Sequence, residues 1–287
     1  MNRFKNIIIS GAEGKPITVD IFYKVSSPQP VIIYAHGFNG FKDWGNFDAI
    51  AEQFVLAGFV FIKFNFSHNG TTPVEPENFV DLEAYGNNNY TKQLDDLEKI
   101  IEWALDKNAP HNEALDTNNL FLIGHSLGGG IALLKAAEDV RVTGISTWAS
   151  VDQCKTPWAS WPAEKLEKWK KTGVDYYTNS RTGQQLPLFY QLYQDFQDNH
   201  ERLNIMYAVQ KLNIPLLICH GSNDEAVQVS SAHKIHEVAK NSRLFLVASD
   251  HVFGRKHPWP QNEMPPPMQE VINETISFFT ENIKHEY

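Results

Sequence analysis

Cysteine is scarce in this sequence, which has Cys154 and Cys219 as its only two cysteines among 287 residues. Two cysteines cannot build the dense disulfide framework of a small secreted domain, and Cys219 lies inside an apolar run that is typical of a buried strand. The first fifteen residues also lack the long apolar core and the small-residue cleavage site of a signal peptide. We therefore expect a cytoplasmic protein.

Long apolar runs and an excess of basic residues are missing as well. No stretch approaches the roughly 20 apolar residues that a transmembrane helix needs. The formal net charge of −9 is opposite to the charge that nucleic acid or an anionic membrane surface attracts. We therefore expect neither of these as a partner. A homodimer is left open, because no pattern in the sequence requires it.

Short apolar runs and helical patterns alternate along most of the chain. Residues 31–37 and 60–66 predict strands, and residues 47–59 between them have helical spacing. In residues 89–107, the side chains of Leu94, Leu97, Ile101 and Ala104 fall on one helical face.

The same alternation returns in the second half. Strands are predicted at residues 119–126, 142–150, 214–221 and 242–249, and helices at 129–139, 230–240 and 268–283. At the front, residues 3–10 and 16–25 predict a β-hairpin. Repeated strand–helix units predict a doubly wound, mostly parallel α/β sheet that forms a single domain over residues 1–287.

Residues 151–211 interrupt this rhythm, because they show no clear strand. Four of the seven tryptophans, Trp148, Trp158, Trp161 and Trp169, lie in or beside this segment. A long excursion between two strands predicts a helical cap over one end of the sheet rather than a loose loop. Residues 75–90, which are acidic and rich in asparagine, predict a surface loop.

The most informative motif is Gly124-His125-Ser126-Leu127-Gly128, a G-x-S-x-G sequence where a predicted strand turns into a helix. A turn this sharp strains the backbone of Ser126, and residues with a Cβ atom two positions before and after it would block the chain. The hydroxyl of Ser126 would then stand exposed at the carboxyl end of the sheet. The motif therefore predicts Ser126 as a nucleophile.

A serine hydroxyl needs a base that takes its proton and a carboxylate that orients the base. Asp224 and His251 each follow an apolar strand, in the chain order that this arrangement requires. We predict His251 as the base in preference to His257, which lies further into a proline-rich loop. Asp224 is the preferred acid, with Asp152 as the next candidate. Glu225 and Asp250 are the weaker alternatives.

Two backbone N–H groups are predicted to hold the oxyanion that forms during acyl transfer. The strand at residues 31–37 ends in His36-Gly37, so the N–H of Phe38 can join that of Leu127 at the start of the helix after Ser126. His36, His125 and His220 are expected to have structural roles. In residues 64–70, the turn formed by Asn69-Gly70 is the favoured interpretation over a pocket-lining role.

In this order, "AHGFNGFKDW", "FNFSHNG", "GHSLGG", "HGSNDEAV" and "ASDHVF" resemble the α/β-hydrolase superfamily, within its dienelactone-hydrolase-like and cinnamoyl- or feruloyl-esterase-like branch. The resemblance covers nearly the whole chain. It implies a Ser126–His251–Asp224 triad, oxyanion donors at Phe38 and Leu127, a cap and no cofactor. Dienelactone hydrolases carry cysteine at the nucleophile position, so the serine here disfavours their substrate.

These features predict a serine hydrolase that cleaves small-molecule carboxylic esters through an acyl-enzyme. The aromatic cap favours an aromatic, feruloyl- or cinnamoyl-type substrate. A peptidase or amidase of the same superfamily is the first alternative, because the triad suits both kinds of acyl group. A catalytically silent hydrolase fold that serves as a binding module is the second, since a fold alone does not establish an activity.

Overall fold

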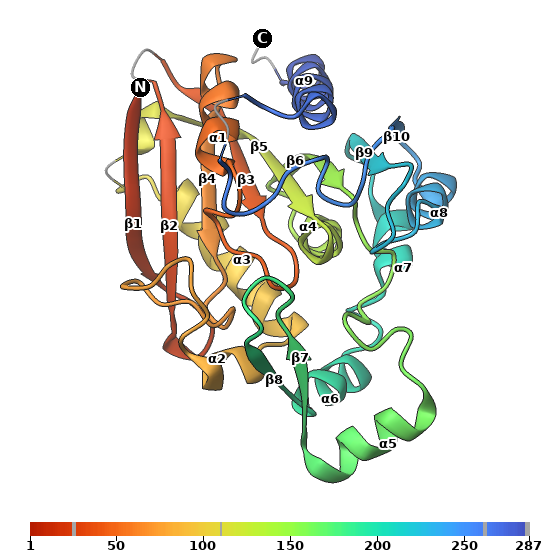
Figure 1. Ribbon diagram of the computed structural model, residues 1–287. Coiled ribbons are helices and arrows are strands. Elements are labelled where there is room, and N and C mark those ends of the chain that lie inside the picture. The colour runs from red at the N-terminus through yellow and green to blue at the C-terminus, as the bar shows by residue number, and fades with distance from the viewer. Residues whose placement is uncertain (25–26, 110, 261–262, 285–287) are drawn as a thin grey trace.

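The computed structural model describes residues 1–24, 27–109, 111–260 and 263–284. Its centre is an eight-stranded sheet in the order β1-β2-β4-β3-β5-β6-β9-β10 (Figure 1). The bounds of these strands are β1 (Asn2–Ser10), β2 (Pro16–Tyr23), β3 (Gln29–Ala35), β4 (Val60–Asn65), β5 (Leu115–His125), β6 (Val142–Trp148), β9 (Leu216–Gly221) and β10 (Ser242–Val247). All neighbouring pairs from β4 to β10 are parallel, whereas β2 is antiparallel to both β1 and β4. The predicted mostly parallel sheet and the predicted hairpin are confirmed. Val25, the last residue of the predicted hairpin, lies outside the described residues.

Helices cover both faces of the sheet, which explains why its central strands are continuous apolar runs. On one face lie α1 (Phe47–Leu56) and α9 (Pro266–Glu281), and on the other lie α3 (Tyr90–Leu105), α4 (Leu127–Glu138) and α8 (Ser230–Val238). In β3, Ile32 and Tyr34 pack toward the first pair of helices, while Val31 and Ile33 pack toward the second group. This alternation divides the core into two layers that sandwich the sheet. No helix in the described ranges is long and apolar enough to cross a membrane.

The segment of residues 75–90 differs from the predicted surface loop. It contains a short helix, α2 (Leu82–Gly86), and the side chains of Phe79 and Tyr85 are buried. The Asp81 carboxylate caps this helix by accepting a hydrogen bond from the Ala84 N–H. The prediction failed because the polar residues of the segment outnumber its three buried aromatic side chains, Phe79, Tyr85 and Tyr90. Two 3₁₀ turns, η1 (Ala12–Gly14) and η2 (Asn112–Ala114), complete the connections of the body.

Most of residues 151–211 lies beyond the carboxyl ends of the parallel strands, whereas the last helix of the segment packs beside α4 and α8 (Figure 1). They form α5 (Ala163–Thr172), β7 (Val174–Thr178), β8 (Gln185–Phe189), α6 (Gln191–Asp198) and α7 (Ile205–Lys211). The prediction that this cap has no strand is wrong, because β7 and β8 pair as a two-stranded antiparallel sheet. Pro187 in β8 argues against a central strand, but both strands of an isolated pair are edge strands, where proline is tolerated.

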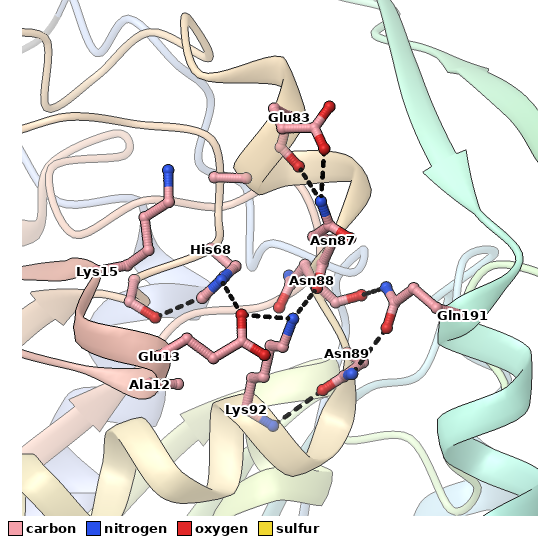
Figure 2. A network of polar contacts seen from close by, with 12 residues as sticks. Ala12, Glu13, Lys15, His68, Glu83, Asn87, Asn88, Asn89, Lys92 and Gln191 are labelled. Atoms are coloured by element: carbon pink, nitrogen blue, oxygen red, sulfur yellow. Dashed lines mark hydrogen bonds and ion pairs between the residues drawn. The ribbon is translucent and has the colours of Figure 1, made fainter.

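The cap is attached to the body through α6. Figure 2 shows Gln191 of α6 beside Asn88 and Asn89, which precede α3. Its side-chain amide donates to the Asn88 carbonyl at 2.8 Å and accepts from the Asn89 side chain at 2.8 Å. One turn later, the Asp195 carboxylate accepts from the N–H groups of Tyr90 and Thr91 at 3.1 and 3.2 Å. These N–H groups lie in the first turn of α3, where backbone donors lack helical partners and the dipole favours an anion. The contacts fix α6 on the body.

A cluster of buried charges ties the front hairpin to the loop after β3. The side chains of Asp20, Lys42 and Lys63 are fully buried, and Asp20 Oδ2 lies 2.8 Å from Lys42 Nζ and 3.0 Å from Lys63 Nζ. Asp43 contacts both ammonium groups as well. A buried ion must be paired, since an uncompensated charge in the interior is strongly destabilising.

We predict that Asp20→Asn lowers the free energy of unfolding by about 3–5 kcal/mol, because two buried ammonium groups lose a shared counter-ion. Urea denaturation followed by circular dichroism measures the change. The matched control is Glu102→Gln, which removes a carboxylate from the exposed Lys99–Glu102 pair. The control should shift stability by no more than about 0.5 kcal/mol. Equal effects of the two substitutions would contradict the prediction.

Candidate active site

Ser126 stands at the sharp turn between β5 and α4. Its backbone has φ 55° and ψ −120°, a strained conformation for a residue with a side chain. The Ser126 N–H donates to the Trp148 carbonyl at 2.9 Å, which ties the turn to the neighbouring strand β6. Its side chain is half-buried rather than enclosed. The turn therefore presents the hydroxyl at the carboxyl edge of the sheet.

Three glycines allow the backbone segments around Ser126 to converge. A Cβ atom on Gly128 would collide with the carbonyl oxygens of Ala35 and His36, and one on Gly124 would collide with the backbone of Gly128. A Cβ atom on Gly37 would lie 2.9 Å from the Cβ of Ser126. The first turn of α4 thus packs directly on the end of β3. The G-x-S-x-G spacing is required by this packing as well as by the turn.

Asp224 and His251 follow β9 and β10 and meet beside Ser126. His251 Nδ1 lies 2.7 Å from Asp224 Oδ2, while Asp224 Oδ1 accepts from the backbone N–H groups of Ala226 and Val227 at 2.9 and 2.8 Å. Burial alone would raise the pKa of the Asp224 carboxyl, but hydrogen bonds from His220, His251 and the Val227 N–H outweigh it and hold the pKa well below its usual range. Asp224 therefore stays ionised and accepts the proton on His251 Nδ1.

The competing acids are occupied elsewhere. Asp152 accepts from Ser231 Oγ at 3.1 Å and pairs with Lys234 Nζ at 2.8 Å, so it binds to α8 rather than to His251. Asp250 Oδ1 accepts from the backbone N–H groups of Val252 and Gly254 within its own turn. Of these three carboxylates, Asp224 is the one in contact with His251.

The remaining histidines support the loops around the site. His125 Nε2 lies 2.9 Å from the His251 carbonyl, and His257 Nδ1 accepts from the Gly45 N–H at 2.9 Å. Burial holds the pKa of His125 well below its usual value and lowers that of His36 to about 4, so both rings are neutral. His220 Nε2 lies 2.8 Å from the Val227 carbonyl and 3.3 Å from Asp224 Oδ2.

His220 contributes more to the site than the sequence indicated. A carbonyl can only accept, so the proton of His220 resides on Nε2, next to both Val227 and Asp224. The ring therefore supports the loop that carries the acid. The only sequence signal is its position at the end of a strand, one residue before a glycine, which is also common for purely structural histidines.

The loop from His36 to Lys42 holds the first predicted oxyanion donor, Phe38, against the turn at Ser126. Asn69 Nδ2 donates to the Gly40 carbonyl at 3.3 Å, and the Lys42 N–H donates to Asn65 Oδ1 at 2.6 Å. The second predicted donor, Leu127, is the first residue of α4, where an N–H has no helical partner. The structure thus anchors both segments that would carry the donors. His68 faces Glu13 at 3.4 Å (Figure 2), away from the pocket described next.

A cavity of about 140 Å³ brings the reactive groups together. Among the described residues, its lining consists of Tyr34, His36, Gly37, Phe38, Asn39, Gly40, Phe41, Trp44, Phe47, His125, Ser126, His251, Val252 and Arg255. Its aromatic wall comes from the body of the protein. The cap tryptophans pack on one another instead, with ring centroids of Trp158 and Trp169 5.8 Å apart and those of Trp161 and Trp169 5.2 Å apart. None of these three tryptophans lines the cavity.

The strand order and the helices on both faces define an α/β-hydrolase fold, and solved structures agree. The complex of DcsB with its substrate analogue is 16% identical, with a TM-score of 0.71, and the match covers 98% of this chain and 99% of that one. Est1E from Butyrivibrio proteoclasticus with bound ferulic acid is 16% identical, with a TM-score of 0.70 and coverage of 96% and 98%. The α/β hydrolase GrgF from Penicillium sp. sh18 is 19% identical, with a TM-score of 0.69 and coverage of 98% and 99%.

Within this class, the family model BD-FAE matches residues 19–238, and the chain belongs to the BD-FAE family. The quorum-quenching protein AidA of Acinetobacter baumannii (strain MDR-ZJ06) is 30% identical over 127 residues, which are 44% of this chain and 35% of AidA. An uncharacterized 31.7 kDa protein from the traX-finO intergenic region of Escherichia coli is 32% identical over 113 residues, 39% of this chain and 34% of that protein. These matches span about a third of the length of the two curated relatives.

We predict that Asp224→Asn slows the reaction of Ser126 with a fluorophosphonate probe by about 10³–10⁴-fold, because the amide disfavours the required histidine tautomer. Labelling rates from gel fluorescence measure the effect without assuming a natural substrate. Asp152→Asn is the matched control and should stay within about twofold of the wild type. A larger loss in Asp152→Asn than in Asp224→Asn would overturn the assignment of the acid.

Proposed function

We propose that this chain is a serine hydrolase that cleaves carboxylic esters through an acyl-enzyme intermediate. The observation that carries the proposal is the placement of Ser126 and His251 in one cavity while His251 Nδ1 contacts the ionised Asp224. An ionised carboxylate only accepts hydrogen bonds, so the ring proton of neutral His251 resides on Nδ1. Nε2 is then free to accept the proton of the serine hydroxyl.

The proposed reaction has two halves. Ser126 Oγ attacks the ester carbonyl while His251 Nε2 takes its proton, and Asp224 stabilises the imidazolium that forms. The tetrahedral oxyanion accepts hydrogen bonds from the N–H groups of Phe38 and Leu127. When the tetrahedral intermediate collapses, the bond to the alkoxide oxygen breaks and His251 gives its proton to the leaving alcohol. Water then attacks the acyl-enzyme with the same proton transfers and releases the acid, so the route needs no cofactor.

The aromatic wall of the cavity favours an apolar or aromatic group next to the ester, and a feruloyl- or cinnamoyl-type ester is our proposed substrate class. Phe38, Phe41, Trp44 and Phe47 supply this wall. The ferulic acid bound to Est1E supports the same class, although the likeness to that protein is one of fold. An amide substrate is the alternative, because the same triad serves both reactions.

We expect wild-type protein to hydrolyse p-nitrophenyl butyrate and Ser126→Ala to lose at least about 10³-fold in kcat, since the nucleophile is removed. Release of p-nitrophenol, followed at its absorbance maximum, measures both. Ser160→Ala, a substitution of an exposed cap serine, is the control and should match the wild type. Equal activity in wild type and Ser126→Ala would rule out Ser126 as the nucleophile.

A second comparison separates esterase from amidase. The proposal predicts that kcat/KM for methyl ferulate exceeds that for an aminoacyl p-nitroanilide, because an amide needs stronger protonation of its leaving group. Chromatography of released ferulate and absorbance of released nitroaniline give the two constants. A higher constant for the anilide would favour the amidase.

A further inference from the structure

Arg255 is a buried cation in the wall of the catalytic cavity. Arg255 is 4% exposed. It lies four positions after His251 on the same loop, and both residues line the cavity. The Nε atom donates to the Val252 carbonyl at 2.9 Å, whereas Nη1 is buried and has no hydrogen-bond partner among the described residues. The guanidinium carbon lies 4.7 Å from the ring centroid of Phe47 and 5.4 Å from that of Trp44.

No carboxylate of the described residues forms an ion pair with this group. Burial lowers the pKa of Arg255 to about 10, so it remains protonated at neutral pH. The titratable groups that act on the pKa of Arg255 are Tyr34 and Asp250. The Asp250 carboxylate already accepts hydrogen bonds from two backbone N–H groups in its own turn. Aromatic rings recover part of the cost of burying a cation, but they do not satisfy a directed N–H donor.

A second pocket, of about 320 Å³, adjoins the catalytic cavity. The two share Asn39, Trp44, Val252 and Arg255 as lining residues. The second pocket adds two exposed cations, Arg181 from the turn between β7 and β8 in the cap and Lys256 from the body. Neither forms an ion pair with a carboxylate in the part of the chain that the structure describes. Asp43 is the carboxylate that acts on the pKa of the neighbouring His257, but it already forms ion pairs with Lys42 and Lys63.

Three cations that form no ion pair within the described residues therefore line two adjoining pockets, one of which contains Ser126, in a chain whose formal net charge is −9. A local cluster of positive charge in an acidic protein attracts anions, and the buried Arg255 has an N–H donor without an acceptor. The cluster is therefore suited to an anionic ligand. Because the buried member also lines the cavity of Ser126 and His251, an anion bound to it would lie in the same cavity as the two reactive groups.

We propose that the substrate is an anionic ester, in which a carboxylate on the acyl or the alcohol part binds Arg255, with Arg181 and Lys256 at the outer end of the site. This inference rests on the proposed esterase function and narrows its substrate class. Arg255 is a specificity residue: it binds the substrate at a distance from the reacting carbonyl and takes no part in proton transfer.

Two matched substrate pairs test it, each differing only in whether a carboxylate is free or methylated. The first pair is p-nitrophenyl hydrogen suberate and p-nitrophenyl methyl suberate, with the charge on the acyl part. The second is 4-acetoxybenzoate and methyl 4-acetoxybenzoate, with the charge on the leaving alcohol. We expect kcat/KM for the anionic member of one pair to exceed that of its neutral partner about 10–100-fold. The preference should shrink as salt is raised.

Substitutions then show which side chains cause the preference for the anionic ester. Arg255→Gln should lower kcat/KM for the anionic ester far more than for the neutral ester, so that the preference disappears, and Arg255→Lys should restore part of it. Arg181→Gln and Lys256→Gln should each reduce it about twofold to threefold, since exposed charges are screened. Lys170→Gln removes an exposed positive charge elsewhere in the cap and should leave the preference unchanged.

Several outcomes overturn the inference. Ser126-dependent hydrolysis with no preference for either anionic ester would refute it and leave the esterase proposal intact, and an equal loss on both members of a pair in Arg255→Gln would show that Arg255 is structural. If Arg255→Gln fails to fold, the salt dependence of the preference and the Arg181→Gln and Lys256→Gln variants still test the anion site.

If no ester is hydrolysed, the esterase proposal fails. Calorimetry of Ser126→Ala with p-nitrophenyl hydrogen suberate then tests the anion site by itself: tighter binding than its methyl ester supports it, and equal binding refutes it.

Discussion

The close approach of α4 to the end of β3 is the constraint on which the rest of the site depends. Gly128 has the carbonyl oxygens of Ala35 and His36 where a side chain would be, and Gly124 has the backbone of Gly128. Because these segments touch, the turn at Ser126 is forced into its strained conformation and held there by neighbouring strands. The same approach brings the loop after β3, with Phe38, to the start of α4. One backbone contact thus positions both the nucleophile and the segments that would bind the oxyanion.

Among the described residues, buried charges are paired at the front hairpin and at Asp224, whereas the buried cation of the catalytic cavity has no ion-pair partner. At the front hairpin, Asp20 lies between two buried lysines. In the active site, the Asp224 carboxylate receives hydrogen bonds from two histidine rings and two backbone N–H groups. Arg255 is the contrast, since its guanidinium is buried against aromatic rings with an unused donor. A buried donor that is left unsatisfied costs stability, and the carboxylate of the proposed substrate would supply the missing acceptor.

The cap contacts the body through α6 and through its hairpin of β7 and β8. Gln191 and Asp195 bind the first turn of α3 and the residues before it, and the tryptophans of the cap pack into a core of their own. The hairpin of β7 and β8 extends from this base, and Arg181 at its turn lines the outer pocket. The cap therefore contributes charge near the mouth of the site, while the body supplies the aromatic wall next to Ser126.

The sequence by itself determined the parts of this protein that depend on local pattern. Alternating apolar runs and helical spacing identified the strands and helices of the body, because a strand covered on both faces must be apolar throughout. The glycine spacing placed Ser126 at a strand–turn–helix junction, and the chain order after it indicated His251 as the base and left Asp224 as the preferred acid with Asp152 next. Only the tertiary structure distinguished Asp224 from Asp152, since both follow strands at the same sheet edge and a contact with one ring nitrogen decides between them. Only the tertiary structure revealed the β7–β8 pair, His220 and Arg255, because partners and missing partners depend on residues that are distant in the chain.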